Sequence, residues 1–244
     1  MAVLLLFVVP TAGVAVSAQG GTYAGYEVTG PPGQITRVRG SWIVPLVDCE
    51  ITPNSVLNVS SIIDGINGVH DAMEIGTFSD CVNGVAEYGA FVQFYPTTNG
   101  DFDKTLAITV HPGDMVEAQG KWVPLGKPHN VQSWHSSFID FTTHKKVDTD
   151  AVAPVGFVPV ASSGAFIVSS DGKKLSSFST VLSGIDYTKI HNSDVLGLAH
   201  TEVYFGLVGE VTGFSIVAFS MPGATPGPIS ADGSSFAVLE PSAP

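Results

Sequence analysis

The chain has 244 residues, 44% of them hydrophobic and 13% charged, and its 10 basic and 22 acidic side chains give a net charge of −12 at pH 7. This length and composition allow one large all-β domain or two small domains with a full hydrophobic core. An acidic surface repels nucleic acid and anionic lipid, so we expect neither as a partner. Because few basic groups accumulate positive charge when carboxylates become protonated, the composition also favours tolerance to acid.

The N-terminal segment, residues 1–18, has the pattern of a secretory signal peptide. Val3–Val9 is an unbroken apolar run, and Val16-Ser17-Ala18 supplies the small residues typical of a cleavage site. No Lys or Arg precedes the apolar run, and a short membrane anchor is the alternative interpretation. No later segment approaches the ~20 apolar residues of a membrane-spanning helix. We therefore expect a secreted, extracellular protein whose residues 19–244 form one domain that is free of the membrane after cleavage.

Short runs of alternating polarity recur through the rest of the chain, and none keeps the 3.6-residue apolar period of a helix. Apart from a hairpin within Ala72–Pro96, the predicted strands are Tyr23–Val28, Ile35–Val44, Val56–Ile63, Leu106–Val110, Met115–Trp122, Ser136–Phe141, Ala165–Val168, Phe178–Leu182, Glu202–Val208, Phe214–Phe219 and Phe236–Leu239. Pro- and Gly-rich turns separate them, and residues 221–235 are such a connection to the last strand. The pattern predicts an all-β fold, a sandwich of two antiparallel sheets.

The predicted hairpin has an Asn-Gly pair, Asn83-Gly84, at its centre. Such a pair favours a two-residue type I′ turn, which fixes the pairing of the two strands. Glu74 then lies opposite Gln93, on the face that does not carry the apolar side chains. A solvated sheet face is the ordinary interpretation of this carboxylate and amide, because antiparallel sheets commonly expose one polar face.

Two cysteines, Cys49 and Cys81, are the only ones in the chain. In an oxidising compartment an even number favours a disulfide, and two separate buried thiols are the alternative. The sequon Asn58-Val59-Ser60 could accept a glycan in a host that attaches them.

Several kinds of chemistry have no signal in the sequence. The seven histidines show no spacing typical of metal ligands, and no nucleophile elbow or phosphate-binding loop is present. We therefore expect neither a metal nor an organic cofactor. The kind of chemistry that remains as a candidate is that of carboxylates on the open face of the predicted sheet.

A series of motifs in order resembles the eqolisins, the secreted glutamic peptidases. The segments are YAGYEV (23–28), VRGSWIVP (38–45), IIDGING (62–68), MEIGTF (73–78), YGAFVQFYP (88–96), PGDMVEA (112–118) and FIDFTTHKKV (138–147), and the similarity extends over about residues 22–241. The resemblance implies two curved antiparallel sheets in a sandwich of the concanavalin or eqolisin type, with a peptide-binding groove on the concave face. It also implies endopeptidase activity in acid, and hence a polypeptide substrate.

The family's mechanism uses a Gln and a Glu, of which the carboxylate activates water and the amide stabilises the oxyanion. By the resemblance, the dyad Gln falls on Glu74, while a Glu of the family falls on Gln93. Two positions compete for the dyad Glu: Ala165, within the segment Gly164–Val168, and Glu202, within the segment His200–Gly206.

Other groove positions also follow from the resemblance. Tyr23 stands where the family has a leading Trp, Phe91 stands where it has a groove Trp, and Asp64 matches the family. These three are predicted to shape the substrate groove.

Two functional hypotheses follow. The first is a monomeric, acid-acting glutamic-type endopeptidase, with Glu74 and Glu202 as catalytic acids and Gln93 as the oxyanion donor. If Glu202 faced Glu74, the two carboxyls would share one proton, because like charges at close range cannot both ionise. The alternative is a catalytically inactive protein of the same fold that binds an extracellular peptide or glycan or serves as a surface-structural module, since fold alone does not determine function.

Overall fold

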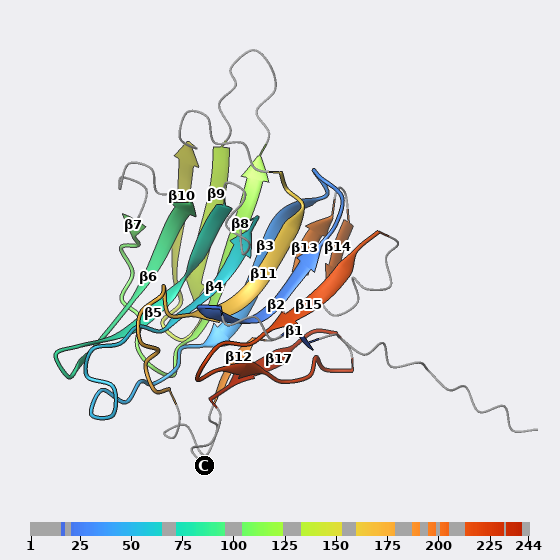
Figure 1. Cartoon of the computed structure of the whole chain (residues 1–244). Helices are drawn as coiled ribbons and strands as arrows, with labels where there is room; N and C mark the ends of the chain where they lie inside the picture. Colours follow the sequence, from blue (N-terminus) through green and yellow to red (C-terminus); the bar gives the residue numbers. More distant parts are fainter. Residues whose placement is uncertain are drawn as a thin grey trace, which may run out of the picture.

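Two layers of β-strands make up the fold in the computed structural model of the chain (Figure 1). The structure describes residues 16–17, 21–64, 72–95, 104–123, 133–152, 160–178, 187–190, 195–198, 201–204, 213–231 and 233–240. All regular elements in these ranges are strands.

The first layer is an eight-stranded sheet in the order β1-β15-β2-β11-β4-β5-β6-β7. Its strands are β1 (Val16–Ser17), β2 (Tyr23–Thr29), β4 (Asn58–Ile63), β5 (Ala72–Val82), β6 (Val85–Tyr95), β7 (Lys104–Thr105), β11 (Ser163–Ser169) and β15 (Ser215–Phe219). Strand pairs are antiparallel except at the edge, where β1 runs parallel to β15. β1 falls within the segment predicted as a signal peptide, and most of that segment lies outside the described residues.

The second layer is a nine-stranded sheet with the main order β10-β9-β8-β3-β12-β17-β16, in which β13 also pairs with β3 and carries β14. Its strands are β3 (Ile35–Ile43), β8 (Met115–Val123), β9 (Ser133–Asp140), β10 (Lys145–Val152), β12 (Tyr187–Ile190), β13 (Val195–Leu198), β14 (Thr201–Tyr204), β16 (Thr225–Pro226) and β17 (Phe236–Leu239). The strand pairs within this sheet are antiparallel. The prediction of an all-β sandwich of antiparallel sheets is confirmed.

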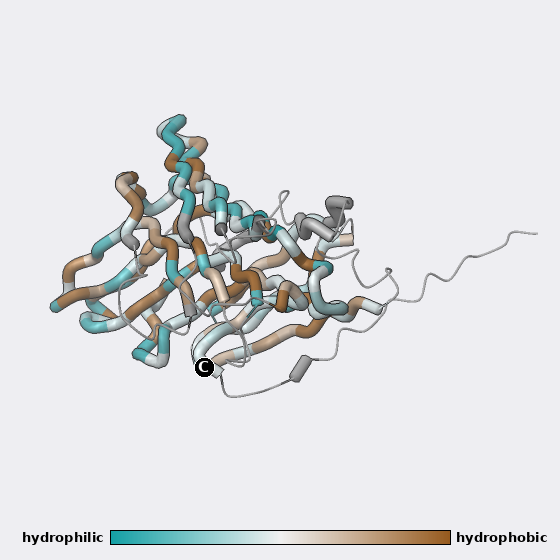
Figure 2. Tube along the Cα trace, turned by 90° about the horizontal axis from the view of Figure 1, so that it is seen from above, coloured by the Kyte–Doolittle hydropathy of each residue, from teal (hydrophilic) through white to brown (hydrophobic). Residues whose placement is uncertain are grey.

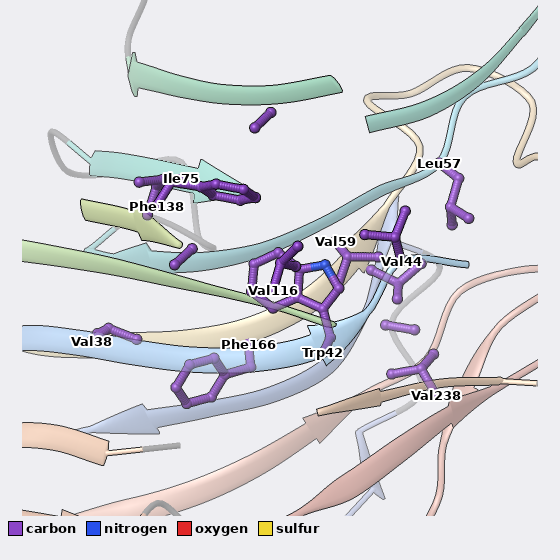
Figure 3. Close-up of a cluster of buried hydrophobic side chains, with 14 of the residues drawn as sticks. Val38, Trp42, Val44, Leu57, Val59, Ile75, Val116, Phe138, Phe166 and Val238 are labelled. Carbon is purple, nitrogen blue, oxygen red and sulfur yellow. The ribbon is translucent and has the colours of Figure 1, made fainter. Parts of the chain in front are cut away.

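The main hydrophobic core lies between the two sheets. Figure 3 shows buried side chains from both of them, among them Trp42 of β3, Val59 of β4 and Phe166 of β11, filling the space between the ribbons. The Trp42 indole Nε1 crosses the core and donates a hydrogen bond of 2.9 Å to the Thr77 hydroxyl on β5. Hydrophobic and hydrophilic residues alternate along many strands (Figure 2), as expected when one face of each sheet packs inward.

The hairpin β5–β6 forms in the predicted register. Asn83 and Gly84 both have positive φ, 52° and 80°, as a type I′ turn requires. Glu74 pairs with Gln93 and Gly76 with Phe91. The turn chemistry alone therefore determined which side chains of these two strands lie opposite each other.

Some predicted strands differ from the structure. Leu106–Val110 has the expected alternating burial but forms no strand, because its backbone lacks a regular partner along its length. The charged strand β10 and the short strands β12 and β13 were not predicted, since their sequences lack a clear apolar alternation. Residues 179–182 of the predicted strand Phe178–Leu182 lie outside the described residues.

Cys49 and Cys81 form a disulfide that joins the loop after β3 to the end of β5. In the described part of the chain, no helix is long and apolar enough to cross a membrane.

Candidate active site

One row of side chains crosses the outer face of the eight-stranded sheet, the face that does not pack on the second sheet. Strand pairing places Glu27 of β2, Ala165 of β11, Ile62 of β4, Glu74 of β5 and Gln93 of β6 side by side in this order. The sequence neighbours of all five contribute to the core between the sheets, so these five point the other way. We call these five residues the central row.

Glu74 is buried in this row, with only 2% of its surface exposed. Its Oε1 accepts a hydrogen bond of 2.5 Å from the Ser60 hydroxyl on the neighbouring strand. The interpretation of this face as solvated is therefore wrong at Glu74. A buried carboxylate that is oriented by a hydroxyl is a typical arrangement for a group that handles a proton.

A pocket of about 200 Å³ opens beside Gln93. Phe78 and Phe91 form apolar parts of its wall, and Asn58, Asp80 and Gln93 supply polar groups. The Gln93 side chain is partly exposed, so its amide can reach a molecule in the pocket. The pocket therefore gives Gln93, the cross-strand partner of Glu74, a place for a ligand that combines apolar and polar parts.

At the other end of the central row, Glu27 is a second buried carboxyl, with 3% of its surface exposed. Burial raises its pKa, a hydrogen bond from the Ser163 side chain lowers it, and the negative charge of Asp64 raises it further. The net effect is a pKa above that of an exposed Glu. Burial and the neighbouring Glu27 also raise the pKa of Tyr23, which lies on the same strand and face.

Replacing Glu27 by Gln should change how stability depends on pH. The folded chain holds the Glu27 proton more tightly than the unfolded chain, so wild-type stability falls as pH rises above about 4.3, the pKa of an unperturbed Glu. Gln does not titrate, so Glu27→Gln should gain stability relative to wild type as the pH rises from about 3 to about 7. Urea unfolding at several pH values measures the difference, and a difference independent of pH would contradict the raised pKa.

Asp64 follows β4 and ties it to the segment before β11. Its carboxylate accepts hydrogen bonds from three successive backbone N–H groups, those of Ala161, Ser162 (2.8 Å) and Ser163 (3.0 Å). Asp64 is 1% exposed and has a positive φ of 49°. Asp64 therefore fixes the backbone that leads into β11.

The predicted aromatic positions lie on the same outer face. Phe91 lines the pocket, and Tyr23 packs against an apolar cluster made of Ile62, Ala72, Ala165 and Ile167. The Tyr23 ring also contacts Phe219 edge-to-face, with 5.4 Å between ring centroids. A row of apolar and aromatic groups thus extends from the central row along the sheet.

Glu202 lies elsewhere. Its strand β14 belongs to the nine-stranded sheet and pairs with β13, whereas Glu74 lies on the eight-stranded sheet. The structure therefore does not bring Glu202 into the central row, and Ala165 occupies the row instead.

The structure also argues against a glycan at Asn58 in the folded protein. Asn58 is 5% exposed, and its Nδ2 donates a hydrogen bond of 2.6 Å to Asp171. Glycan acceptors need an accessible amide nitrogen, which a side chain in a central strand does not offer. Among the described residues, no group of three or more His, Cys, Asp or Glu side chains is arranged to hold a metal ion.

Glu27 is the residue of the central row that sequence reasoning missed. Alternation within YAGYEV could have placed it on the face opposite Tyr26 and Val28. Its position beside Ala165, however, depends on the pairing of β2 with β11, which are more than a hundred residues apart.

Comparisons with known proteins support this fold. Residues 21–121 match the sequence model of the Peptidase A4 family. No curated protein sequence matches the chain.

Three solved structures share the fold. Scytalido-glutamic peptidase, with a peptide-based transition-state analogue, has a TM-score of 0.65 and 14% identity over 90% of this chain and 98% of its own. SCP-B, a member of the eqolisin family in complex with a tripeptide, has a TM-score of 0.61 and 12% identity over 90% and 98%. Aspergilloglutamic peptidase from Aspergillus niger has a TM-score of 0.53 and 17% identity over 76% and 99%. The chain therefore resembles the Peptidase A4 family over residues 21–121, and it shares its fold with solved glutamic peptidases of the eqolisin type.

Proposed function

We propose that this chain is a secreted endopeptidase that hydrolyses polypeptides in acid through Glu74. The observation that carries the proposal is the buried Glu74 carboxyl, held by Ser60 and paired across the strands with Gln93 at the pocket. The eqolisin-type fold adds support for a polypeptide substrate.

In the proposed reaction, the Glu74 carboxylate takes a proton from a water molecule that attacks the peptide carbonyl carbon. The Gln93 amide N–H donates a hydrogen bond to the oxyanion that develops on the carbonyl oxygen. The carbon–oxygen bond forms, the carbon–nitrogen bond breaks, and the leaving amine acquires a proton. Phe91 and Tyr23 would hold the substrate on the outer face.

Composition is consistent with work in acid outside the cell. With 10 basic side chains in 244 residues, little positive charge accumulates when the carboxylates are protonated. The apolar N-terminal run supports export, and we expect the mature chain to act as a monomer.

A second function, peptide binding without hydrolysis, is favoured by one observation. Between Glu74 and Glu27 the central row carries Ile62 and Ala165, both buried and apolar. Ala165 cannot supply the carboxyl that the eqolisin resemblance assigns to its position. A chain with these apolar residues in the central row could hold an extended peptide without cleaving it.

Incubation of the purified chain with an unfolded protein distinguishes the two functions. The peptidase should release fragments between about pH 2 and 5, where carboxyl groups titrate, and mass spectrometry of the fragments would give the cleaved bonds. Chelators should not change the rate. If the chain binds the peptide but does not cleave it over this pH range, the peptidase function is rejected and the peptide-binding function is supported.

A further inference from the structure

Glu27 is a buried ionisable group that the reaction proposed above does not use. On one side it is paired with Ala165 of β11, and on the other side with Val217 of β15. Its neighbours across both strands are therefore apolar, and the side chain is 97% buried, since 3% of its surface is exposed.

A carboxyl in this place costs stability that a Val or Leu would not cost. Removal of an ionisable carboxyl from water is unfavourable unless charged or hydrogen-bonding partners compensate. Among the described residues, the groups that act on Glu27 are the Ser163 hydroxyl from β11, the carboxylate of Asp64 after β4 and Tyr23 on its own strand, and none of these three is a cation. Groups kept at such a cost are concentrated at functional sites.

We propose that Glu27 is a catalytic residue of the central row, the general acid that protonates the leaving amine of the peptide. This inference rests on the proposed peptidase function. It assigns to β2 the second carboxyl of the site, directly beside the position where Ala165 lacks one.

The geometry of the sheet allows this role. Three strand-to-strand steps of about 4.8 Å separate β2 from β5, so the backbones at Glu27 and Glu74 lie about 14 Å apart. Ala165 and Ile62 stand between Glu27 and Glu74 in the row, and the proposal places the peptide bond and its water molecule above these two side chains. Ala165 contributes only a methyl group beside Glu27, and 1% of its surface is exposed.

Protons and bonds balance in this scheme. Glu74 takes one proton from water while the water oxygen bonds to the carbonyl carbon. The tetrahedral intermediate then collapses, the carbon–nitrogen bond breaks, and the Glu27 proton passes to the nitrogen. Glu27 ends ionised and Glu74 protonated, and exchange with solvent restores both.

The electrostatic surroundings suit an acid that must keep its proton. The negative charge of Asp64, which is fixed by three backbone N–H donors, opposes ionisation of Glu27. Burial acts in the same direction. Glu27 would therefore hold its proton to a higher pH than an exposed Glu does, because its pKa is raised.

The test compares Glu27→Gln with wild type and with Glu87→Gln, a matched change at an exposed position of β6. For a peptide substrate, we expect Glu27→Gln to lower kcat/KM by roughly 10²–10⁴-fold, the usual contribution of a general acid. For an activated aryl ester, whose leaving group needs no proton, the two rates should differ much less. Glu87→Gln should match wild type on both substrates.

If Glu27 had only a structural role, Glu27→Gln would lower kcat/KM equally for the peptide and for the aryl ester. This result would overturn the inference. A second variant, Glu27→Gln combined with Ala165→Glu, moves the carboxyl by one strand and should recover part of the peptide activity. If wild type cleaves the peptide and Glu27→Gln cleaves it equally well, the inference fails while the peptidase function stands. If wild type cleaves nothing, the peptidase function itself fails, and the role of Glu27 fails with it.

Discussion

Glu74→Gln should lower kcat/KM for a peptide substrate by roughly 10²–10⁴-fold, because the change removes the base that activates water. Gln has nearly the shape of Glu, and the Ser60 hydroxyl can still donate its hydrogen bond to the amide oxygen of the new side chain. The fold should therefore persist, and the loss should appear in kcat rather than in KM. Steady-state kinetics near pH 4 on a fluorogenic peptide would measure it.

Two further variants separate chemistry from packing at this site. Ser60→Ala removes the hydroxyl that orients Glu74 but keeps the carboxylate, so we expect a smaller loss of kcat. Gln93→Ala removes the proposed oxyanion donor, which is commonly worth about 10²–10³-fold in kcat. Full activity in Glu74→Gln would show that another group is the base.

Asp64→Ala should destabilise the fold by about 3 kcal/mol or more, because it leaves three backbone N–H groups without their acceptor and each buried unsatisfied donor costs about 1–3 kcal/mol. The positive φ of 49° adds to the cost, since Asp tolerates this conformation better than Ala does. Urea unfolding at pH 6 would measure the change in the free energy of unfolding.

Two comparisons isolate the causes. Asp64→Gly also lacks the carboxylate but tolerates the backbone, so it should be about 1 kcal/mol more stable than Asp64→Ala. Asp150→Ala, at a β10 side chain that is 80% exposed, should change stability by no more than about 0.5 kcal/mol. If Asp64→Ala and wild type had the same free energy of unfolding, the proposed role of the three hydrogen bonds would be contradicted.

The local parts of the fold could be predicted well from the sequence. Asn83-Gly84 fixed the turn, and the two-residue periodicity of the flanking strands then placed Glu74 opposite Gln93. These relations involve residues close in the chain, where turn geometry and side-chain alternation decide the outcome. The burial of Glu74 could not be predicted in this way, because it depends on what covers the outer face.

The relations between distant strands could not be predicted from the residues alone. Glu202 has a plausible alternation of its own, but its strand pairs within the other sheet. Glu27 lies beside Ala165 because β2 and β11 pair although they are far apart in the sequence. No local sequence pattern predicts such a pairing. The order of the strands in the sequence does not show which of the two sheets each strand joins. The sheet that a strand joins, however, decides which carboxyl groups lie on the same face.

The pH dependence of peptide cleavage by wild type and Glu74→Gln tests the central claim most directly. We predict that the purified wild type cleaves an unfolded polypeptide with a maximum between about pH 2 and 5, and that the same digest with Glu74→Gln shows almost no product at any pH. The claim would be contradicted if the folded wild type, with its disulfide intact, bound the polypeptide without cleaving it, or if Glu74→Gln cleaved it with the wild-type profile.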